Sequence, residues 1–130
     1  MVKFKLKTLI PKPSDAHLIK LWREVVFKRA KGQCEYCGEK SEYLNAHHIF
    51  SRSHKSTRYD PDNGILLCSL HHALGNNSVH KDPMWWEHAF GQGIRDREFM
   101  KILERRAKTP AKLDYNAIKL DLENELRKFK

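Results

Sequence analysis

The sequence predicts an α+β fold in which a short region of strands and turns lies between helices. Residues 14–32 carry apolar side chains at helical spacing, after a serine that can cap a helix. Residues 43–67 contain two strand-like runs separated by a polar loop and an Asn-Gly turn signal, and further helical segments follow. The 130 residues suit one domain, which we divide into an N-terminal arm and helix (1–32), a central core (33–80) and C-terminal helices (81–130).

The N-terminal part is predicted to be a basic arm followed by an amphipathic helix. Lysine and apolar side chains alternate in residues 1–12, which indicates a short strand or an extended arm that ends at Pro11 and Pro13. The helix begins at Ser14 and ends at Gly32, because glycine favours the backbone conformation found at helix ends. The apolar residues on one face of this helix are Leu18, Leu21, Trp22, Val25 and Val26.

The central region is predicted to form two strands. The first covers residues 43–50 and leads into a polar, basic loop over 51–62. The Asn-Gly pair at 63–64 predicts a turn before the apolar run 65–67, and a helix is expected to begin near Ser69.

Three more helices are predicted towards the C-terminus. Asp82-Pro83 indicates a cap and a first helical position for a short helix that reaches Phe90 and ends at Gly91. A second helix covers residues 95–108. The last, 114–129, is amphipathic, and it either covers the core or forms a dimer interface.

The cysteines indicate a metal site rather than a disulfide framework, because there are only three and no export signal accompanies them. Cys34-x2-Cys37 and Cys68-x2-His71 are two tight turns of the kind that supply four ligands to zinc. A Cys3His set leaves no position for water, so the predicted zinc site is structural. The alternative is three unrelated buried thiols.

A histidine pair lies between the two halves of this set, and His72 directly follows the second half. Adjacent residues on a strand point to opposite faces. We therefore expect His47 and His48 to differ in role, with one binding metal and the other acting on a water molecule.

The charge balance favours a polyanionic partner. Lys and Arg total 25 against 16 Asp and Glu, a net charge of +9, and such a field attracts nucleic acid. An indifferent basic surface would have the same charge. No apolar run approaches the ~20 residues that span a bilayer, and the N-terminus lacks a signal-peptide pattern, so we expect a cytoplasmic protein without membrane contact.

In this order the motifs resemble those of the HNH nuclease family. The residues that carry the resemblance are Cys34, Cys37, His47, His48, Ile49, Asn63, Leu67, Cys68, His71 and His72. The resemblance covers residues 34–72 and implies a ββα-metal (His-Me finger) core within residues 33–80, flanked by additional helices. The small size is also similar to that of free-standing HNH proteins of phages and prophages, which implies a bacterial host cell as the location.

The resemblance implies hydrolysis of DNA phosphodiester bonds by a one-metal mechanism. His48 falls at the position of the general base, and an imidazole with a pKa near 6.5 can take a proton from water at neutral pH. His47 and His72 fall at the positions of ligands to a catalytic divalent cation, and Asn63 at that of a residue orienting the loop. If His47 were the base, Ala46 would occupy a ligand position, which favours His48 as the base.

Two positions depart from the common family pattern. His71 stands where most members have cysteine, so the zinc set is Cys3His, and an exchange of roles between His71 and His72 remains open. His47 stands where many members have aspartate. Mg²⁺, Mn²⁺, Ni²⁺ and Zn²⁺ are all candidate catalytic cations, and the histidine shifts the expected preference towards the last three.

Basic residues in the loop after the base are expected to contact the DNA backbone. They are Arg52, Lys55 and Arg58, with a solvated loop as the alternative. His54 in this loop is expected to be a surface residue. His80 could be a third metal ligand or a phosphate contact, and a capping or surface role is equally open.

Two aromatic and several basic residues outside this loop are weaker candidates. Trp85 and Trp86 could stack on bases, but helical packing is favoured. A wider DNA footprint is suggested by charge alone at Lys3, Lys5, Lys7, Lys12, Arg105 and Arg106.

These features together predict a DNA endonuclease. The alternatives are a non-catalytic zinc-stabilised DNA-binding module and a phage packaging-associated factor that keeps the core only as a scaffold. A binding module has no need of His47, His48 and His72 beside its zinc, which favours the enzyme. Phage packaging or recombination proteins are further candidate partners.

Overall fold

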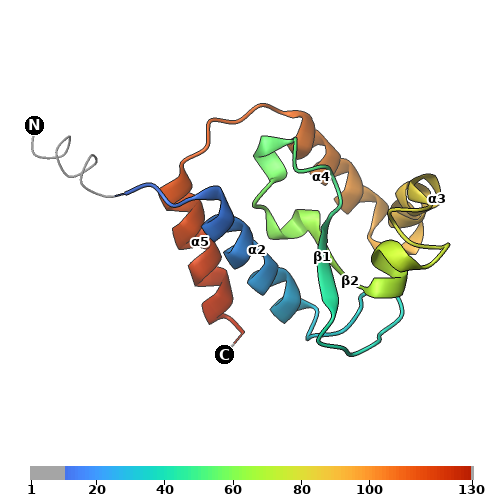
Figure 1. The fold of residues 1–130 in the computed structure, drawn as a ribbon. Helices are drawn as coiled ribbons and strands as arrows, with labels where there is room; N and C mark the ends of the chain where they lie inside the picture. The colour runs from blue at the N-terminus through green and yellow to red at the C-terminus, as the bar shows by residue number, and fades with distance from the viewer. Residues whose placement is uncertain (1–10, 130) are drawn as a thin grey trace, which may run out of the picture.

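Two short antiparallel strands lie at the centre of the structure, a computed structural model that describes residues 11–129 (Figure 1). The elements, in chain order, are α2 (Asp15–Arg29), β1 (Leu44–His48), β2 (Gly64–Cys68), α3 (Pro83–Ala89), α4 (Arg97–Lys108) and α5 (Tyr115–Arg127). The α+β class predicted from the sequence is confirmed. The arm predicted for residues 1–12 falls almost entirely on residues 1–10, which lie outside the described residues.

The strands pair from Leu44 opposite Cys68 to His48 opposite Gly64. β2 is buried along its whole length, whereas β1 is half-buried. The predicted first strand over 43–50 is longer than the observed one, because the chain leaves the ladder after His48 and enters a loop with two 3-10 turns, Lys55–Thr57 and Pro61–Asn63. This loop returns the chain directly to β2.

Helix α2 covers the strands and carries the larger part of the core. Ser14 caps it as predicted, since its hydroxyl accepts a hydrogen bond from the His17 N–H at 3.1 Å. A Cβ atom added at Gly64 would lie 2.4 Å from Val26 Cγ2 and 2.9 Å from Trp22 Cζ2, so α2 packs directly on the backbone where β2 begins. Helix α5 lies beside α2 (Figure 1) and buries Leu122 there, which shows that the last helix covers the core.

The segment after β2 is less helical than predicted. A helix does begin after Ser69, but it is a π-helical turn of five residues, Leu70–Leu74. It ends at Gly75, whose N–H donates to the Leu70 carbonyl at 2.9 Å. A side chain would not fit at this end of the turn without a shift of the backbone, because a Cβ added at Gly75 would lie 2.7 Å from that same oxygen.

Two details of the C-terminal helices were predicted wrongly. The side chain of Asp82 makes no capping hydrogen bond to α3. The helical backbone also continues past Gly91 in a π-helical turn, Phe90–Ile94, and breaks only at Gly93, which has a φ of 150°. The later helices do have side-chain caps, Asp96 for α4 and Asp114 for α5.

The start of α2 is joined to the loop between the strands by a cluster of polar contacts. The carboxylate of Asp15 accepts hydrogen bonds from Arg58 Nε at 2.8 Å, from Arg58 Nη2 at 2.9 Å and from the Tyr59 hydroxyl at 2.6 Å. The bonds from Arg58 and then Tyr59 lower the pKa of Asp15 from 3.8 to about 2.

None of the described helices has the length and apolar content needed to cross a bilayer.

Replacement Asp15→Asn is expected to lower the melting temperature by a few degrees at pH 7, because about 1 kcal/mol is typical of a partly exposed charged contact. A depressed pKa in the folded protein means that the carboxylate stabilises the fold above its ordinary pKa. The wild type should therefore lose this advantage as the pH falls from 3.8 to about 2.

Thermal melts of wild type and variant across this pH range test the prediction. Glu42→Gln, at an exposed residue with no described ion pair, is the matched control. A difference between Asp15→Asn and wild type that stays constant down to pH 2 would contradict this role for Asp15.

Candidate functional site

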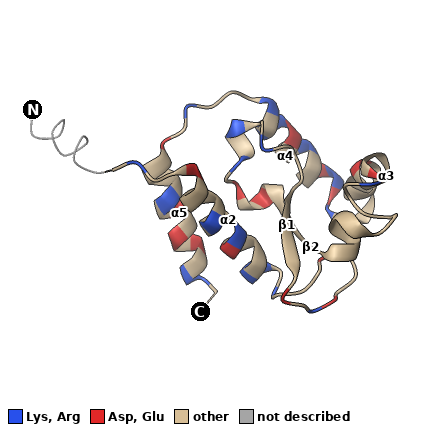
Figure 2. Cartoon of the chain, in the orientation of Figure 1, with Lys and Arg blue, Asp and Glu red and all other residues tan. Residues whose placement is uncertain are grey.

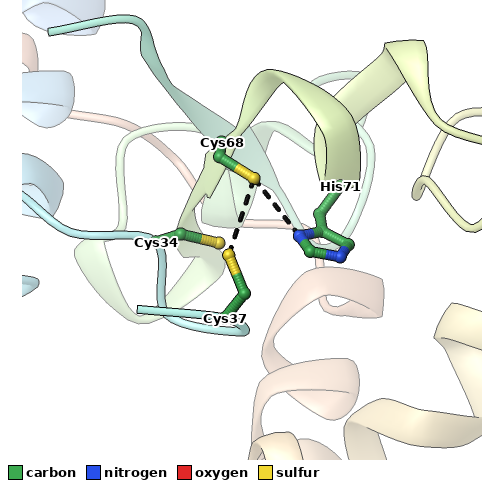
Figure 3. Close-up of side chains that lie close together, drawn as sticks. All are labelled: Cys34, Cys37, Cys68 and His71. Atoms are coloured by element: carbon green, nitrogen blue, oxygen red, sulfur yellow. Dashed lines mark hydrogen bonds between the residues drawn. The ribbon is translucent and has the colours of Figure 1, made fainter. Parts of the chain in front are cut away.

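Three cysteines and a histidine converge between the turn after α2 and the end of β2 (Figure 3). Cys37 Sγ lies 3.8 Å from Cys68 Sγ, and Cys68 Sγ lies 3.2 Å from His71 Nδ1. In a tetrahedron with Zn–S bonds of about 2.3 Å, two sulfur ligands lie about 3.8 Å apart. The four donor atoms lie within 4.8 Å of one another, so the set fits one tetrahedral cation.

The backbone shapes the first half of this cluster before any ion binds. The Cys34 N–H donates to the Glu39 carbonyl, and the Gly38 N–H donates to the Cys34 carbonyl, each at 2.8 Å. Gly38 has a φ of 79°, a conformation that glycine adopts without strain. Burial raises the pKa of the Cys68 thiol to about 12, so a bound cation is needed to hold this sulfur as a thiolate at neutral pH.

Glu35, within the same turn, ties the cluster to the rest of the fold. Its carboxylate accepts from the Leu66 N–H at 2.7 Å and pairs with Arg95 at 3.0 Å and Arg29 at 3.7 Å. These contacts reach β2, the segment before α4 and the end of α2. The closed Cys3His cluster is therefore built into the junction of these elements.

A second cluster consists of His47, His72 and His80, whose ring nitrogens also lie within 4.8 Å of one another. His72 Nε2 and His80 Nε2 are 3.0 Å apart. The turn that carries His72 and the segment that carries His80 are held together by two backbone hydrogen bonds. The Val79 N–H donates to His71 O at 2.8 Å, and the His80 N–H donates to His72 O at 3.1 Å. Of the roles open for His80, the geometry thus favours a ligand, and it puts His71 with the cysteines and His72 with the histidines.

Two histidines of this cluster have lowered pKa values, which favours the neutral form that can bind a cation. Burial, followed by the neighbouring His80 and His72, lowers the pKa of His47 from 6.5 to about 4. Burial and His80 also lower the pKa of His72. Both rings are consequently neutral at pH 7, which is the form that binds metal.

His48 points away from this cluster, as expected for the neighbour of His47 on a strand. Its Nε2 lies 2.9 Å from the carbonyl oxygen of Arg58. Because a carbonyl oxygen only accepts, Nε2 carries the proton, and Nδ1 has no hydrogen-bond partner among residues 11–129. Burial lowers the pKa of His48 below 6.5 and keeps the ring neutral, while Trp22 stacks on it with ring centroids 3.9 Å apart.

Asn63 closes the loop that follows His48. Its side chain is 0% exposed, and both the oxygen and the nitrogen of its amide group make hydrogen bonds. Oδ1 accepts from the Phe50 N–H at 2.7 Å, and Nδ2 donates to the carbonyls of Phe50 at 2.9 Å and Thr57 at 3.1 Å. The loop from His48 to Asn63 is in this way held by one side chain at its far end.

Both histidine groups open onto one cleft of about 810 Å³. Its wall also includes Arg23 and Arg52, which lie near His48 and contribute to the depression of the His48 pKa. Arg23 and Trp22 are site residues that the sequence analysis missed as such. The only signal for them was their place on α2, where Trp22 was assigned to the apolar face.

The basic loop residues differ in how free their side chains are. Lys55 is exposed, and Arg52 is exposed at 3.7 Å from Asp15. Arg58 is bonded to Asp15 through two nitrogens, and His54 belongs to neither metal-ligand cluster.

The structure also distinguishes among the weaker candidates of the sequence analysis, the two tryptophans and Arg106. Trp86 is 0% exposed and donates from Nε1 to the Asn77 carbonyl at 3.2 Å, so helical packing explains it. Trp85 is 40% exposed. Arg106 pairs with Asp60 and Asp62, which fastens α4 to the loop.

A closed Cys3His cluster thus lies near an open cluster of three histidines and a neutral, hydrogen-bonded imidazole, and both clusters are sets of donor atoms that could hold a metal ion. Residues 34–74, about a third of the chain, match the family model described as HNH endonuclease. This match supports membership of the HNH endonuclease family, as the motifs predicted, and with it a nuclease-type function. No curated protein and no solved structure matches the chain.

Replacement Cys37→Ser is expected to remove one ligand of the closed cluster and to lower the melting temperature by at least ~10 °C, because a structural metal contributes directly to folding free energy. The bound zinc should fall from about one equivalent to well below it. Thermal melts and metal analysis of the same samples test both parts, with the exposed Glu39→Gln in the same turn as the control. An unchanged melting temperature would remove structural zinc from the account.

Proposed function

We propose that the protein is a divalent-cation-dependent DNA endonuclease in which His48 is the general base. One observation carries this proposal: a neutral imidazole, hydrogen-bonded at Nε2 and with no partner at Nδ1 among residues 11–129, lies in the same cleft as a cluster of three further imidazoles. On this proposal, β1, β2 and the turn at Leu70–Leu74 form a ββα-metal core. The family match supports the reaction class.

His48 would take a proton from the attacking water at Nδ1. The bond from Nε2–H to the Arg58 carbonyl selects the tautomer with a lone pair on Nδ1. The lowered pKa, caused first by burial, keeps that lone pair available at pH 7. Asn63 has a supporting role, since its three hydrogen bonds hold the loop that carries the Arg58 carbonyl.

His47, His72 and His80 would hold the catalytic cation. Three imidazole donors leave coordination positions for a phosphate oxygen and water. A divalent cation bound there supplies charge stabilisation to the scissile phosphate and to the leaving oxygen. The donor set contains nitrogen alone among the described residues, which favours Zn²⁺, Ni²⁺ or Mn²⁺ over the oxygen-preferring Mg²⁺.

DNA would enter along the basic side of the cleft. Figure 2 shows Lys and Arg along α2, α4 and α5, interspersed with acidic residues, and the net charge of the chain is +9. Arg52 and Lys55 would contact phosphates together with Arg23, which the sequence analysis did not include. Arg58 was predicted as a DNA contact, but its bonds to Asp15 favour a role in holding the loop.

A zinc-stabilised DNA-binding module is a weaker account of the same molecule. It explains the positive charge and the Cys3His cluster. It gives no reason for a second, separate cluster of histidines or for a base-like imidazole in the same cleft.

Replacement His48→Ala is expected to reduce cleavage of plasmid DNA by about 10²- to 10⁴-fold, the usual contribution of a general base. DNA affinity and bound metal should stay close to wild type, because His48 is not in either ligand cluster. The experiment measures nicked and linear product at saturating metal, and DNA binding by the same proteins.

The control is His54→Ala, which removes a histidine from the same loop but from neither cluster. Full cleavage by His48→Ala would refute the assignment of the base. A wild-type protein that binds DNA but cleaves it with none of the candidate cations would favour the binding module.

A further inference from the structure

We propose that Trp22 is a positioning residue for the general base His48, so that helix α2 contributes a residue to the active site. The inference rests on the proposed function, because it gives Trp22 a role in catalysis only if His48 takes the proton from water. Trp22 lies outside the segment that matches the family model, residues 34–74.

The contact between the two rings is flat and close. The ring centroids of Trp22 and His48 are 3.9 Å apart, and the ring planes differ by 8°. At this separation and angle the two ring faces lie directly against each other. A rotation of the imidazole out of its plane would break the stack.

Trp22 is itself immobilised. Its side chain is 0% exposed, and its Nε1–H donates to the carbonyl of Asp60 at 2.8 Å. Gly64, the first residue of β2, has no side chain, and the indole packs closely against its backbone: a Cβ at Gly64 would come within 2.9 Å of the indole. The indole is therefore a fixed surface against which the imidazole lies.

Two contacts together determine the orientation of the His48 ring. Stacking on Trp22 sets the plane of the ring, and the hydrogen bond to the Arg58 carbonyl sets the direction of Nε2 within that plane. The terminal torsion of a histidine is otherwise broad. Once both are satisfied, the position of Nδ1 is determined as well.

Both contacts also lead to the same short stretch of loop. His48 bonds to the carbonyl of Arg58, and Trp22 bonds to the carbonyl of Asp60, two residues further on. The base, the indole and the loop thus form a closed ring of contacts. Loss of the indole face would free the imidazole on one side while leaving its hydrogen bond intact.

A residue that serves only as core would behave differently. Its loss would lower the melting temperature but would not change the turnover of the molecules that remain folded. Leu18 provides this comparison, because it is also 0% exposed and packs in the same core on the same helix.

The experiment compares Trp22→Leu, Trp22→Phe and Leu18→Ala as full-length proteins, with cleavage of a DNA duplex measured well below each melting temperature. We expect Trp22→Leu to lose about 10²-fold in kcat, the scale of an error of about 1 Å in a reacting group, with KM for DNA within about twofold of wild type. Trp22→Phe keeps a flat face and should recover to within about tenfold of wild type. Leu18→Ala should melt earlier and keep its kcat within about twofold.

A spectroscopic measurement keeps the inference testable even if Trp22→Leu does not fold. In wild-type protein, the ring current of the indole should move the carbon-bound ring protons of His48 upfield in the NMR spectrum. Unshifted ring protons would overturn the stack in solution.

The outcomes separate this inference from the function on which it rests. A wild type that cleaves DNA, with a folded Trp22→Leu variant of normal kcat, would overturn the role of Trp22 and leave the nuclease intact. A wild type that cleaves no DNA with any candidate cation would overturn the function and this role together.

Discussion

The pairing of β1 with β2 is the constraint on which the two candidate metal clusters and the position of His48 depend. Its register puts Leu44 opposite Cys68 at one end and His48 opposite Gly64 at the other. The first end adjoins the Cys3His cluster, and the second opens into the loop held by Asn63. A slip of one residue would exchange the faces of His47 and His48. The same register therefore separates His47, which lies with His72 and His80, from His48, which stacks on Trp22 of α2.

On the proposed function, one cluster stabilises the fold and the other holds the catalytic cation. Cys34, Cys37, Cys68 and His71 form a closed set that joins α2, the first turn and β2, and Glu35 reinforces this junction from inside the turn. His47, His72 and His80 face the cleft instead. The neighbours His71 and His72 belong to different clusters, so on the proposed function one π-helical turn would couple the structural ion to the catalytic one.

Local patterns predicted the elements of the fold better than the contacts between them. The spacing of the cysteines, the alternation at His47 and His48 and the Asn63 turn each depend on a few adjacent residues, and each has its counterpart in the structure. The association of His80 with His47 depends on how residues 71–80 fold back, which no periodicity encodes. The pairing of Arg58 with Asp15 and the stack of Trp22 on His48 join distant segments, so composition could only describe those residues as basic or apolar. The need for a residue without a side chain at Gly75 likewise becomes visible only in the structure, where the Leu70 carbonyl lies beside it.

The most direct test of the central claim is DNA cleavage measured against the number of metal equivalents bound, starting from metal-free protein. One equivalent of zinc should restore the fold without cleavage, because the Cys3His cluster fills first, and cleavage should appear only with a second equivalent of Ni²⁺ or Zn²⁺ and far less with Mg²⁺. His80→Ala should require more of the second metal, and His88→Ala on α3 should not. Full cleavage at one equivalent would contradict the separation of a structural from a catalytic ion.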